Sequence, residues 1–180
     1  MRRFVLVAAV AAALAGCATN SGSDATEHRS GFSGGRIVSI SPHGAICPIA
    51  TMGVGCSSLG AYWDSTRPDR AQLVVMLLDA RYKSISGLDL NIDGRITRLE
   101  PISLPTASER IPGAGVVQSS RHFATTLAIV RELKSAKRVW LRIHTLDGYL
   151  ESAIIDGAQD SKAYHAIGRF VEQVDAIPPR

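Results

Sequence analysis

The sequence predicts an α+β fold, in which an antiparallel sheet carries two helices packed on one face. The sheet is predicted by two Asp-Gly pairs, Asp93–Gly94 and Asp147–Gly148, each of which lies between stretches that alternate apolar and polar residues. Such pairs are typical of two-residue turns in β-hairpins. The helices are predicted because an apolar pattern at helical spacing follows each hairpin.

The globular part is expected to open with a strand at residues 36–41, which Pro42 and Gly44 end by turning the chain. Residues 45–60 are small and rich in glycine. The apolar run at 71–78 favours a central strand that is buried on both sides, because it is short and contains adjacent valines, although a helix is the alternative.

The register of the first hairpin follows from its two-residue turn. Leu88 should lie opposite Leu99 on the inward face, and Asp89 opposite Arg98 on the solvent face. An exposed ion pair of this kind contributes only about 0 to 1 kcal/mol.

Residues 100–118 are rich in proline and glycine, which predicts either a disordered surface loop or a binding lip. We expect Ser119 or Ser120 to cap a helix that reaches about Lys137. The apolar face of that helix would contain Phe123, Leu127, Val130 and Leu133.

The second hairpin, residues 138–155, offers a candidate interaction surface. With Leu146 paired to Tyr149, its inward face is apolar, and His144 lies opposite Glu151 on the other face. Tyr, Trp and Arg are enriched at interface hot spots. The alternative is that residues 100–118 or the N-terminal strand cover this face and make Trp140 a core residue. The candidate surface consists of Trp140, Arg142, His144, Tyr149 and Glu151.

The last helix should be capped by Asp160 or Ser161 and should end before Pro178. Its apolar stripe contains Tyr164, Ile167, Phe170, Val171 and Val174.

The N-terminus has the pattern of an export signal. Arg2 and Arg3 precede an apolar run, residues 4–14, that is shorter than the roughly 20 residues needed to span a bilayer. An ordinary secretory signal or a short buried helix would also fit this pattern. The sequence Leu-Ala-Gly-Cys at residues 14–17 resembles the lipobox of bacterial lipoproteins.

This resemblance implies that residues 1–16 are a signal peptide, removed by cleavage before Cys17. It also implies a diacylglyceryl group on the Cys17 sulfur and an acyl group on the new amino terminus. Several acyl chains anchor a protein stably to its membrane. Ala18, which stands where an Asp would retain the protein in the inner membrane, implies an outer-membrane anchor that faces the periplasm.

Residues 17–35 are expected to be the lipidated cysteine and a flexible tether, because they are rich in Gly and Ser. They contain a G-x-S-x-G pattern at residues 31–35. A nucleophile elbow needs a strand before the motif and a helix after it, so we interpret this match as a coincidence. Residues 36–180 then form one globular domain.

If Cys17 carries lipid, Cys47 and Cys56 remain as one pair. The envelope is oxidising, so we expect a disulfide between them, which would stabilise the domain by roughly 2.5 to 3 kcal/mol. The alternatives are two free thiols or half of a metal site with His43, although the spacing of a four-ligand zinc site is absent.

Charge argues against nucleic acid as a partner. The 180-residue chain has 20 basic and 16 acidic residues, and removal of Arg2 and Arg3 with the signal leaves 18 basic residues against those 16. A nearly neutral domain without a block of like charges lacks the basic patch that nucleic-acid binding requires.

No catalytic, metal-binding or cofactor-binding motif stands out. The five histidines do not occur at ligand spacing, and Asp93 and Asp147 already serve as turn residues. We therefore expect no catalytic residue, no metal and no cofactor. The favoured function is a non-enzymatic binding or assembly module that contacts another envelope protein; the alternative is an envelope hydrolase or small-ligand carrier.

Overall fold

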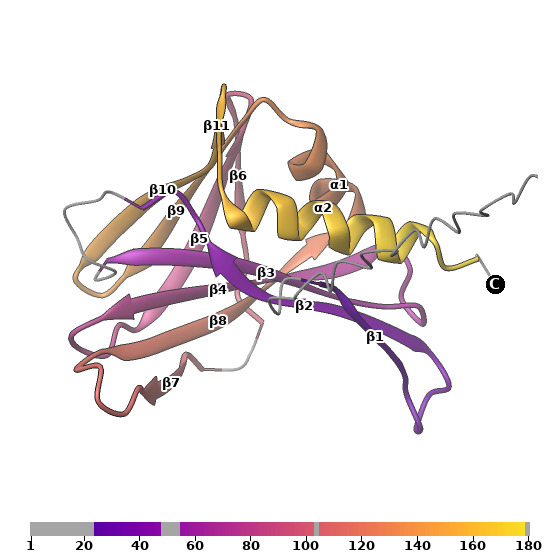
Figure 1. Cartoon of the computed structure of the whole chain (residues 1–180), viewed down its shortest axis with the longest axis horizontal. Helices are drawn as coiled ribbons and strands as arrows, with labels where there is room; N and C mark the ends of the chain where they lie inside the picture. The colour runs from indigo at the N-terminus through magenta and orange to yellow at the C-terminus, as the bar shows by residue number, and fades with distance from the viewer. Residues whose placement is uncertain (1–23, 48–54, 103–104, 179–180) are drawn as a thin grey trace, which may run out of the picture.

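The computed structural model describes residues 24–47, 55–102 and 105–178 of the chain. Strands predominate, and two short helices complete the fold (Figure 1). The α+β class with an antiparallel sheet and two helices is confirmed at this level, and the fold is mainly β.

The larger sheet has six antiparallel strands in the order β1-β2-β3-β4-β8-β7. One face of the central strand β4 is buried, whereas its other face is only half-buried, so the expectation of burial on both sides is half right. The strands are β1 (Thr26–Arg29), β2 (Arg36–Gly44), β3 (Cys56–Asp64), β4 (Arg70–Asp79), β7 (Ala107–Arg110) and β8 (Val117–Thr126).

The smaller sheet has five antiparallel strands in the order β11-β10-β9-β5-β6. It contains both predicted hairpins, and β5 pairs with β9 to join them. The strands are β5 (Ile85–Ile92), β6 (Arg95–Leu99), β9 (Arg138–Thr145), β10 (Gly148–Asp156) and β11 (Gln159–Asp160).

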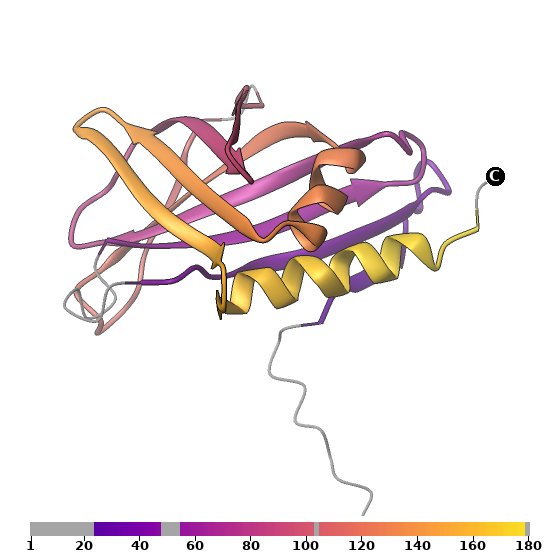
Figure 2. The ribbon, with the colours of Figure 1, turned by 90° about the horizontal axis from the view of Figure 1, so that it is seen from above.

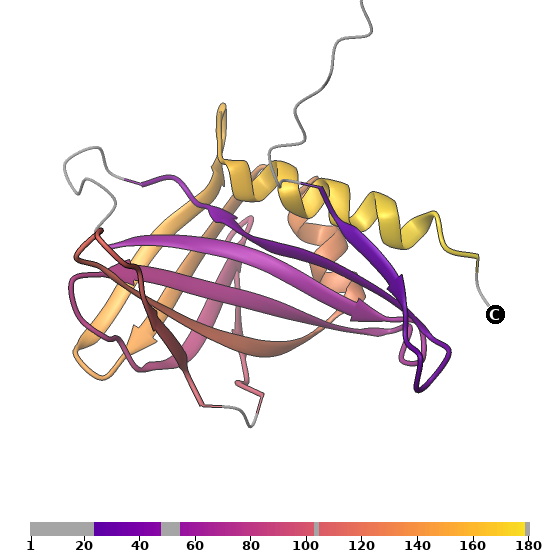
Figure 3. The same ribbon diagram turned by 60° about the horizontal axis from the view of Figure 1, so that its bottom comes forward.

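Two isolated bridges connect the sheets. Ile46, just after β2, pairs with Ala153 of β10, and Pro101, just after β6, pairs with Phe123 of β8. The two sheets therefore curve around a shared interior (Figure 3). Their inward faces supply most of the core, which includes the fully buried side chains Leu59, Leu73, Leu88, Leu90, Phe123, Leu141 and Ile143.

The helices α1 (Leu127–Ser135) and α2 (Lys162–Asp175) lie together beside the six-stranded sheet (Figure 2). The hydroxyl of Thr126 caps α1 by accepting from the amide of Ile129 at 3.3 Å, and that of Ser161 caps α2 by accepting from Tyr164 at 3.2 Å. The predicted last helix and its Ser161 cap are confirmed. Its buried stripe contains Ala163, Ala166, Ile167, Phe170, Val171 and Val174.

The register of the first hairpin is the one that the sequence predicts. Leu88 pairs with Leu99, and Asp89 pairs with Arg98, whose side chain lies 3.7 Å from the aspartate. Asp93 and Gly94 form the turn with positive φ angles of 49° and 94°. Asp and Gly adopt such angles at low cost, which explains why this register could be derived from the sequence.

The helix predicted from Ser119 or Ser120 to Lys137 is wrong in its first half. Residues 117–126 form strand β8, which pairs with β4 along its whole length, and α1 begins only at Leu127. Val117, Ser119 and Phe123 are buried on the inward face. Their positions differ by even numbers of residues, which is the spacing that places side chains on one face of a strand.

The second hairpin has a different register from the predicted one. Tyr149 pairs with His144 instead of Leu146, and the turn consists of Leu146 and Asp147. The carboxylate of Asp147 accepts a hydrogen bond from Lys83 at 3.0 Å, a long-range contact that local turn chemistry does not include. Because the shift is two residues, the side chains up to Ala153 nevertheless keep their predicted faces. A bulge between Ala153 and Ile155 moves Ile155, which we expected on the outer side, opposite the buried Val139.

Three segments for which we predicted no strand contain one. Strand β1 lies within the expected tether, residues 17–35, and its Glu27 is bonded to Arg36 of β2 at 2.9 Å and to Gln173 of α2 at 2.7 Å. Strand β7 lies within residues 100–118, and the glycine-rich stretch at 45–60 ends in β3. Each of these strands forms through partners far away in the sequence, so local composition does not indicate them.

The expected disulfide is present between Cys47 and Cys56. Their Cα atoms lie 5.4 Å apart, and the bond links the chain after β2 to the first residue of β3. In the chain-entropy model, closing so short a loop stabilises the fold by roughly 2.5 to 3 kcal/mol.

Gly60 is required where β2 bulges. The register of β2 against β3 shifts between Ile40 and His43, and this bulge brings the backbone of β2 against Gly60. A Cβ atom on Gly60 would lie 2.5 Å from the Ile40 carbonyl oxygen and 2.8 Å from the Pro42 nitrogen. Both contacts are with backbone, which cannot move aside as a side chain does.

We therefore expect Gly60→Ala to lower the free energy of unfolding by about 1 to 3 kcal/mol, the usual cost of overpacking a core. Gly44→Ala is the matched control, because Gly44 is a glycine of the paired strand β2 at which a methyl group would approach no neighbouring atom within 4 Å. Urea unfolding of the two variants measures the difference. Equal stabilities would show that β2 does not approach β3 this closely.

Candidate functional site

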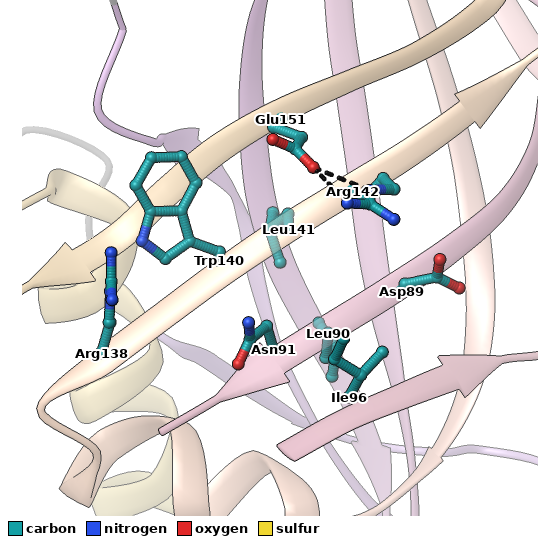
Figure 4. A pocket seen from close by; sticks show the side chains of 9 residues that line it. All are labelled: Asp89, Leu90, Asn91, Ile96, Arg138, Trp140, Leu141, Arg142 and Glu151. Carbon is teal, nitrogen blue, oxygen red and sulfur yellow. Dashed lines mark hydrogen bonds and ion pairs between the residues drawn. The ribbon is translucent and has the colours of Figure 1, made fainter. Parts of the chain in front are cut away.

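The candidate site is the solvent face of β5, β9 and β10, which we call the outer face. Register places four charged side chains in one row across it, from Arg98 through Asp89 and Arg142 to Glu151. The charges alternate in sign, with 3.7 Å between Arg98 and Asp89. Arg142 and Glu151 lie 2.7 Å apart (Figure 4). The row is therefore neutral as a whole.

A second row lies beside the charged one. Asn91 of β5 pairs with Ile96 of β6 on one side and with Trp140 of β9 on the other. Trp140 is half-buried and its indole lies over the sheet, whereas Ile96 is 67% exposed (Figure 4). The two rows border a depression of about 290 Å³, lined by Asp89, Leu90, Asn91, Ile96, Arg138, Trp140, Leu141, Arg142 and Glu151.

His144 and Tyr149 form a third row, directly opposite each other on β9 and β10. The Nε2 atom of His144 lies 2.7 Å from the carboxylate of Asp89, and the Arg142 guanidinium lies 5.1 Å from the centre of the Tyr149 ring. The hydrogen bond and the charge of Glu151 raise the pKa of Arg142 further above its ordinary value. These contacts hold the polar and aromatic groups in fixed positions.

Two atoms of the outer face are buried without a hydrogen-bond partner among the described residues. They are the Nε1 donor of Trp140 and the Oδ1 acceptor of Asp89. A buried donor or acceptor that stays unpaired costs about 1 to 3 kcal/mol. A bound molecule that supplies an acceptor to Trp140 and a donor to Asp89 would remove this cost.

Exposed hydrophobic side chains gather on and beside the outer face. Of the five large hydrophobic residues that are exposed in the described chain, Ile96, Leu146 and Tyr149 belong to the strands and the turn of this sheet. Tyr82 directly precedes Lys83, whose ammonium group pairs with Asp147 in the same turn. The fifth, Phe32, lies in the turn between β1 and β2, and Figure 1 shows this turn far from the turn between β9 and β10.

The five residues proposed from the sequence all lie on the outer face. Arg142, Tyr149 and Glu151 are exposed there, and Trp140 and His144 are half-buried, so residues 100–118 do not cover this face. The predicted contact between His144 and Glu151 is wrong, because the register is shifted. Glu151 pairs with Arg142 and accepts a hydrogen bond from it, whereas the His144 ring contacts the carboxylate of Asp89.

Sequence reasoning did not include the neighbouring strand in the site. Asp89 and Asn91 join it because β5 pairs with β9, and Ile96 joins it through β6. The predicted position of Asp89 on the solvent face could have indicated that it belongs to the site. The pairing of the two hairpins with each other was not visible in the sequence.

The remaining expected sites lie elsewhere. Cys17 lies outside the described residues. His43, the alternative metal ligand beside Cys47, has its Nδ1 2.6 Å from the Ser41 carbonyl oxygen. Within residues 24–47, 55–102 and 105–178, no group of three or more His, Cys, Asp or Glu side chains could hold a metal ion.

Neither helix of the described chain is long and apolar enough to cross a membrane. No protein-family model, no curated protein and no solved structure matches the chain. Its function is therefore argued from its sequence and from the geometry of the outer face.

The ion pair between Lys83 and Asp147 gives a pH-dependent prediction. The hydrogen bond from Lys83, with its positive charge, lowers the pKa of Asp147 below its ordinary value. The pair therefore stabilises the fold fully above the unfolded pKa of about 4, and this contribution is lost as the pH falls through the lower, folded pKa.

We expect Lys83→Met to raise the pKa of Asp147 back toward its ordinary value in an NMR titration of the side-chain carboxyl group. Lys134→Met is the control, because Lys134 pairs with Glu172 of α2 instead. An unchanged titration of Asp147 in Lys83→Met would contradict the ion pair.

Proposed function

We propose that this chain is a lipoprotein of the bacterial outer membrane, anchored by lipid on Cys17 and facing the periplasm. The support is the sequence of its first 17 residues, in which a basic start, a short apolar run and Leu-Ala-Gly-Cys occur in the expected order. Two or more acyl chains are enough to keep such a domain on its membrane.

We further propose that the domain is a non-enzymatic binding module and that its outer face holds another envelope protein. The observation that carries this proposal is that the outer face combines paired charged side chains with buried polar atoms that have no hydrogen-bond partner among the described residues. Trp140 and Asp89 each have a buried polar atom without a hydrogen-bond partner among the described residues, beside exposed apolar side chains. Interface cores are typically aromatic and apolar, with Arg enriched and the remaining charges paired.

The anchor is tested by Cys17→Ala. We expect this variant to lose incorporation of labelled fatty acid and to leave the membrane fraction, because the acyl chains can no longer be attached. Cys47→Ala with Cys56→Ala is the control and should keep the label. Continued labelling of Cys17→Ala would refute the lipidation of Cys17.

The binding face is tested by photocrosslinking in cells. A benzophenone side chain at Ile96 and one at Tyr149 should capture the same partner protein, whereas one at Lys162, an exposed residue of α2, should not. Trp140→Ala should abolish capture from both positions, because it removes the aromatic side chain whose buried Nε1 donor has no hydrogen-bond partner among the described residues.

Stability measurements separate a binding role of these residues from a structural one. Tyr149→Ala should change the free energy of unfolding by no more than about 0.5 kcal/mol, as is usual for an exposed side chain. A variant with both Trp140→Ala and Tyr149→Ala should stay folded and lose capture. If it loses as much as the roughly 3 to 5 kcal/mol typical of a truncated core aromatic, Trp140 is a core residue and the proposal fails.

A further inference from the structure

The turn between β1 and β2 presents an aromatic side chain to solvent on a fixed scaffold. The Ser30 hydroxyl accepts hydrogen bonds from the amides of Phe32 at 3.3 Å and Ser33 at 3.1 Å. The Ser30 amide donates to the Gly35 carbonyl at 2.8 Å and closes the turn. Phe32 itself is 104% exposed. This is the G-x-S-x-G segment, and it forms a rigid tip.

Cationic side chains surround this tip. Arg29 ends β1 and donates from Nε to the Gly34 carbonyl at 3.2 Å. The turn after β3 lies alongside, because the Arg36 amide donates to the Ser65 hydroxyl at 2.8 Å. This turn carries Arg67 and leads to Arg70, the first residue of β4.

Arg29, Arg67 and Arg70 form no ion pair with any described residue. Asp64 and Asp69 lie in the same turn region, and the carboxylate of Asp64 accepts from the amide and the hydroxyl of Thr66 at 2.8 and 2.9 Å. The end of the molecule around Phe32 is therefore apolar at its tip and weakly basic around it.

The chain length places this end near the proposed anchor. Six residues lie between Cys17 and Asp24, and the seven Cα-to-Cα steps of a fully extended chain between them span at most about 25 Å. From Asp24 the chain leads through β1 directly to the tip. The turn of β9 and β10 lies at the other end of the long axis (Figure 1).

We propose that the Phe32 tip is a second membrane contact of this protein, which rests on the lipid anchor proposed above. The Phe32 ring inserts at the boundary between the headgroups and acyl chains of the anchoring leaflet, and Arg29, Arg67 and Arg70 face its anionic phospholipids. This contact orients the domain along its long axis. The outer face and the turn at Leu146 then point away from the bilayer, where a partner can reach them.

The test uses the full-length lipidated protein in vesicles of phosphatidylethanolamine and phosphatidylglycerol that contain brominated lipid. Two variants each carry one new tryptophan, Phe32→Trp at the tip and Leu146→Trp at the opposite turn, where Leu146 is 81% exposed. Bromine quenches only fluorophores that enter the bilayer. We expect several-fold stronger quenching at position 32 than at position 146, after subtraction of the unsubstituted protein.

The arginines are tested in the Phe32→Trp background by changing Arg29, Arg67 and Arg70 to Gln. Quenching at position 32 should fall on vesicles that contain phosphatidylglycerol and should depend less on salt. Arg98→Gln, on the outer face, is the matched control and should leave the quenching unchanged.

Vesicle flotation keeps the two proposals distinguishable. If the protein floats but position 32 is quenched no more than position 146, the tip does not touch the bilayer and the inference is overturned while the anchor stands. If the protein does not float, the anchor fails and the inference falls with it. If benzophenone at position 32 crosslinks to a second copy or to another protein instead of lipid, the tip has a protein partner and the inference is also overturned.

Discussion

The pairing of β5 with β9 is the interaction on which the rest of this structure depends. It joins two hairpins that are separated by 38 residues of sequence, 100–137. On the inward side it aligns Leu88 and Leu90 with Ile143 and Leu141, all of which are fully buried. On the outward side the same register aligns Asp89 with Arg142. A single ladder of backbone hydrogen bonds therefore fixes both the core of the domain and the charge row of the candidate site, and a change in its register would disturb both together.

The features that could be derived from the sequence are those that depend on local chemistry. Asp93 and Gly94 suit a tight turn, so the register of the first hairpin followed, and the Ser161 cap with its apolar stripe defined α2. The features that failed depend on distant partners. Strand β8 has a pattern compatible with a helix until β4 pairs with it, and the second hairpin takes its register with Asp147 bonded to Lys83.

The candidate site was predictable in part for a related reason. The period of two along a strand assigned Trp140, Arg142, His144, Tyr149 and Glu151 to one face, and a two-residue error in register does not change that assignment. Cross-strand contacts are more sensitive, so the partner of His144 was wrong. Asp89 and Asn91 complete the site through a sheet order that no local pattern specifies.

The neutrality of the outer face has a consequence for how a partner could find it. Its charges alternate in sign along the row from Arg98 to Glu151, and residues 17–180, the proposed mature chain, carry only two more basic than acidic residues. Such a surface gives little long-range electrostatic steering, which needs fields of one sign. The proposed lipid anchor would supply the alternative, because confinement to a membrane surface raises the effective concentration of a domain toward partners in the same membrane, provided that its geometry allows contact. A fixed orientation, with the Phe32 end at the bilayer and the Leu146 end away from it, would meet that condition.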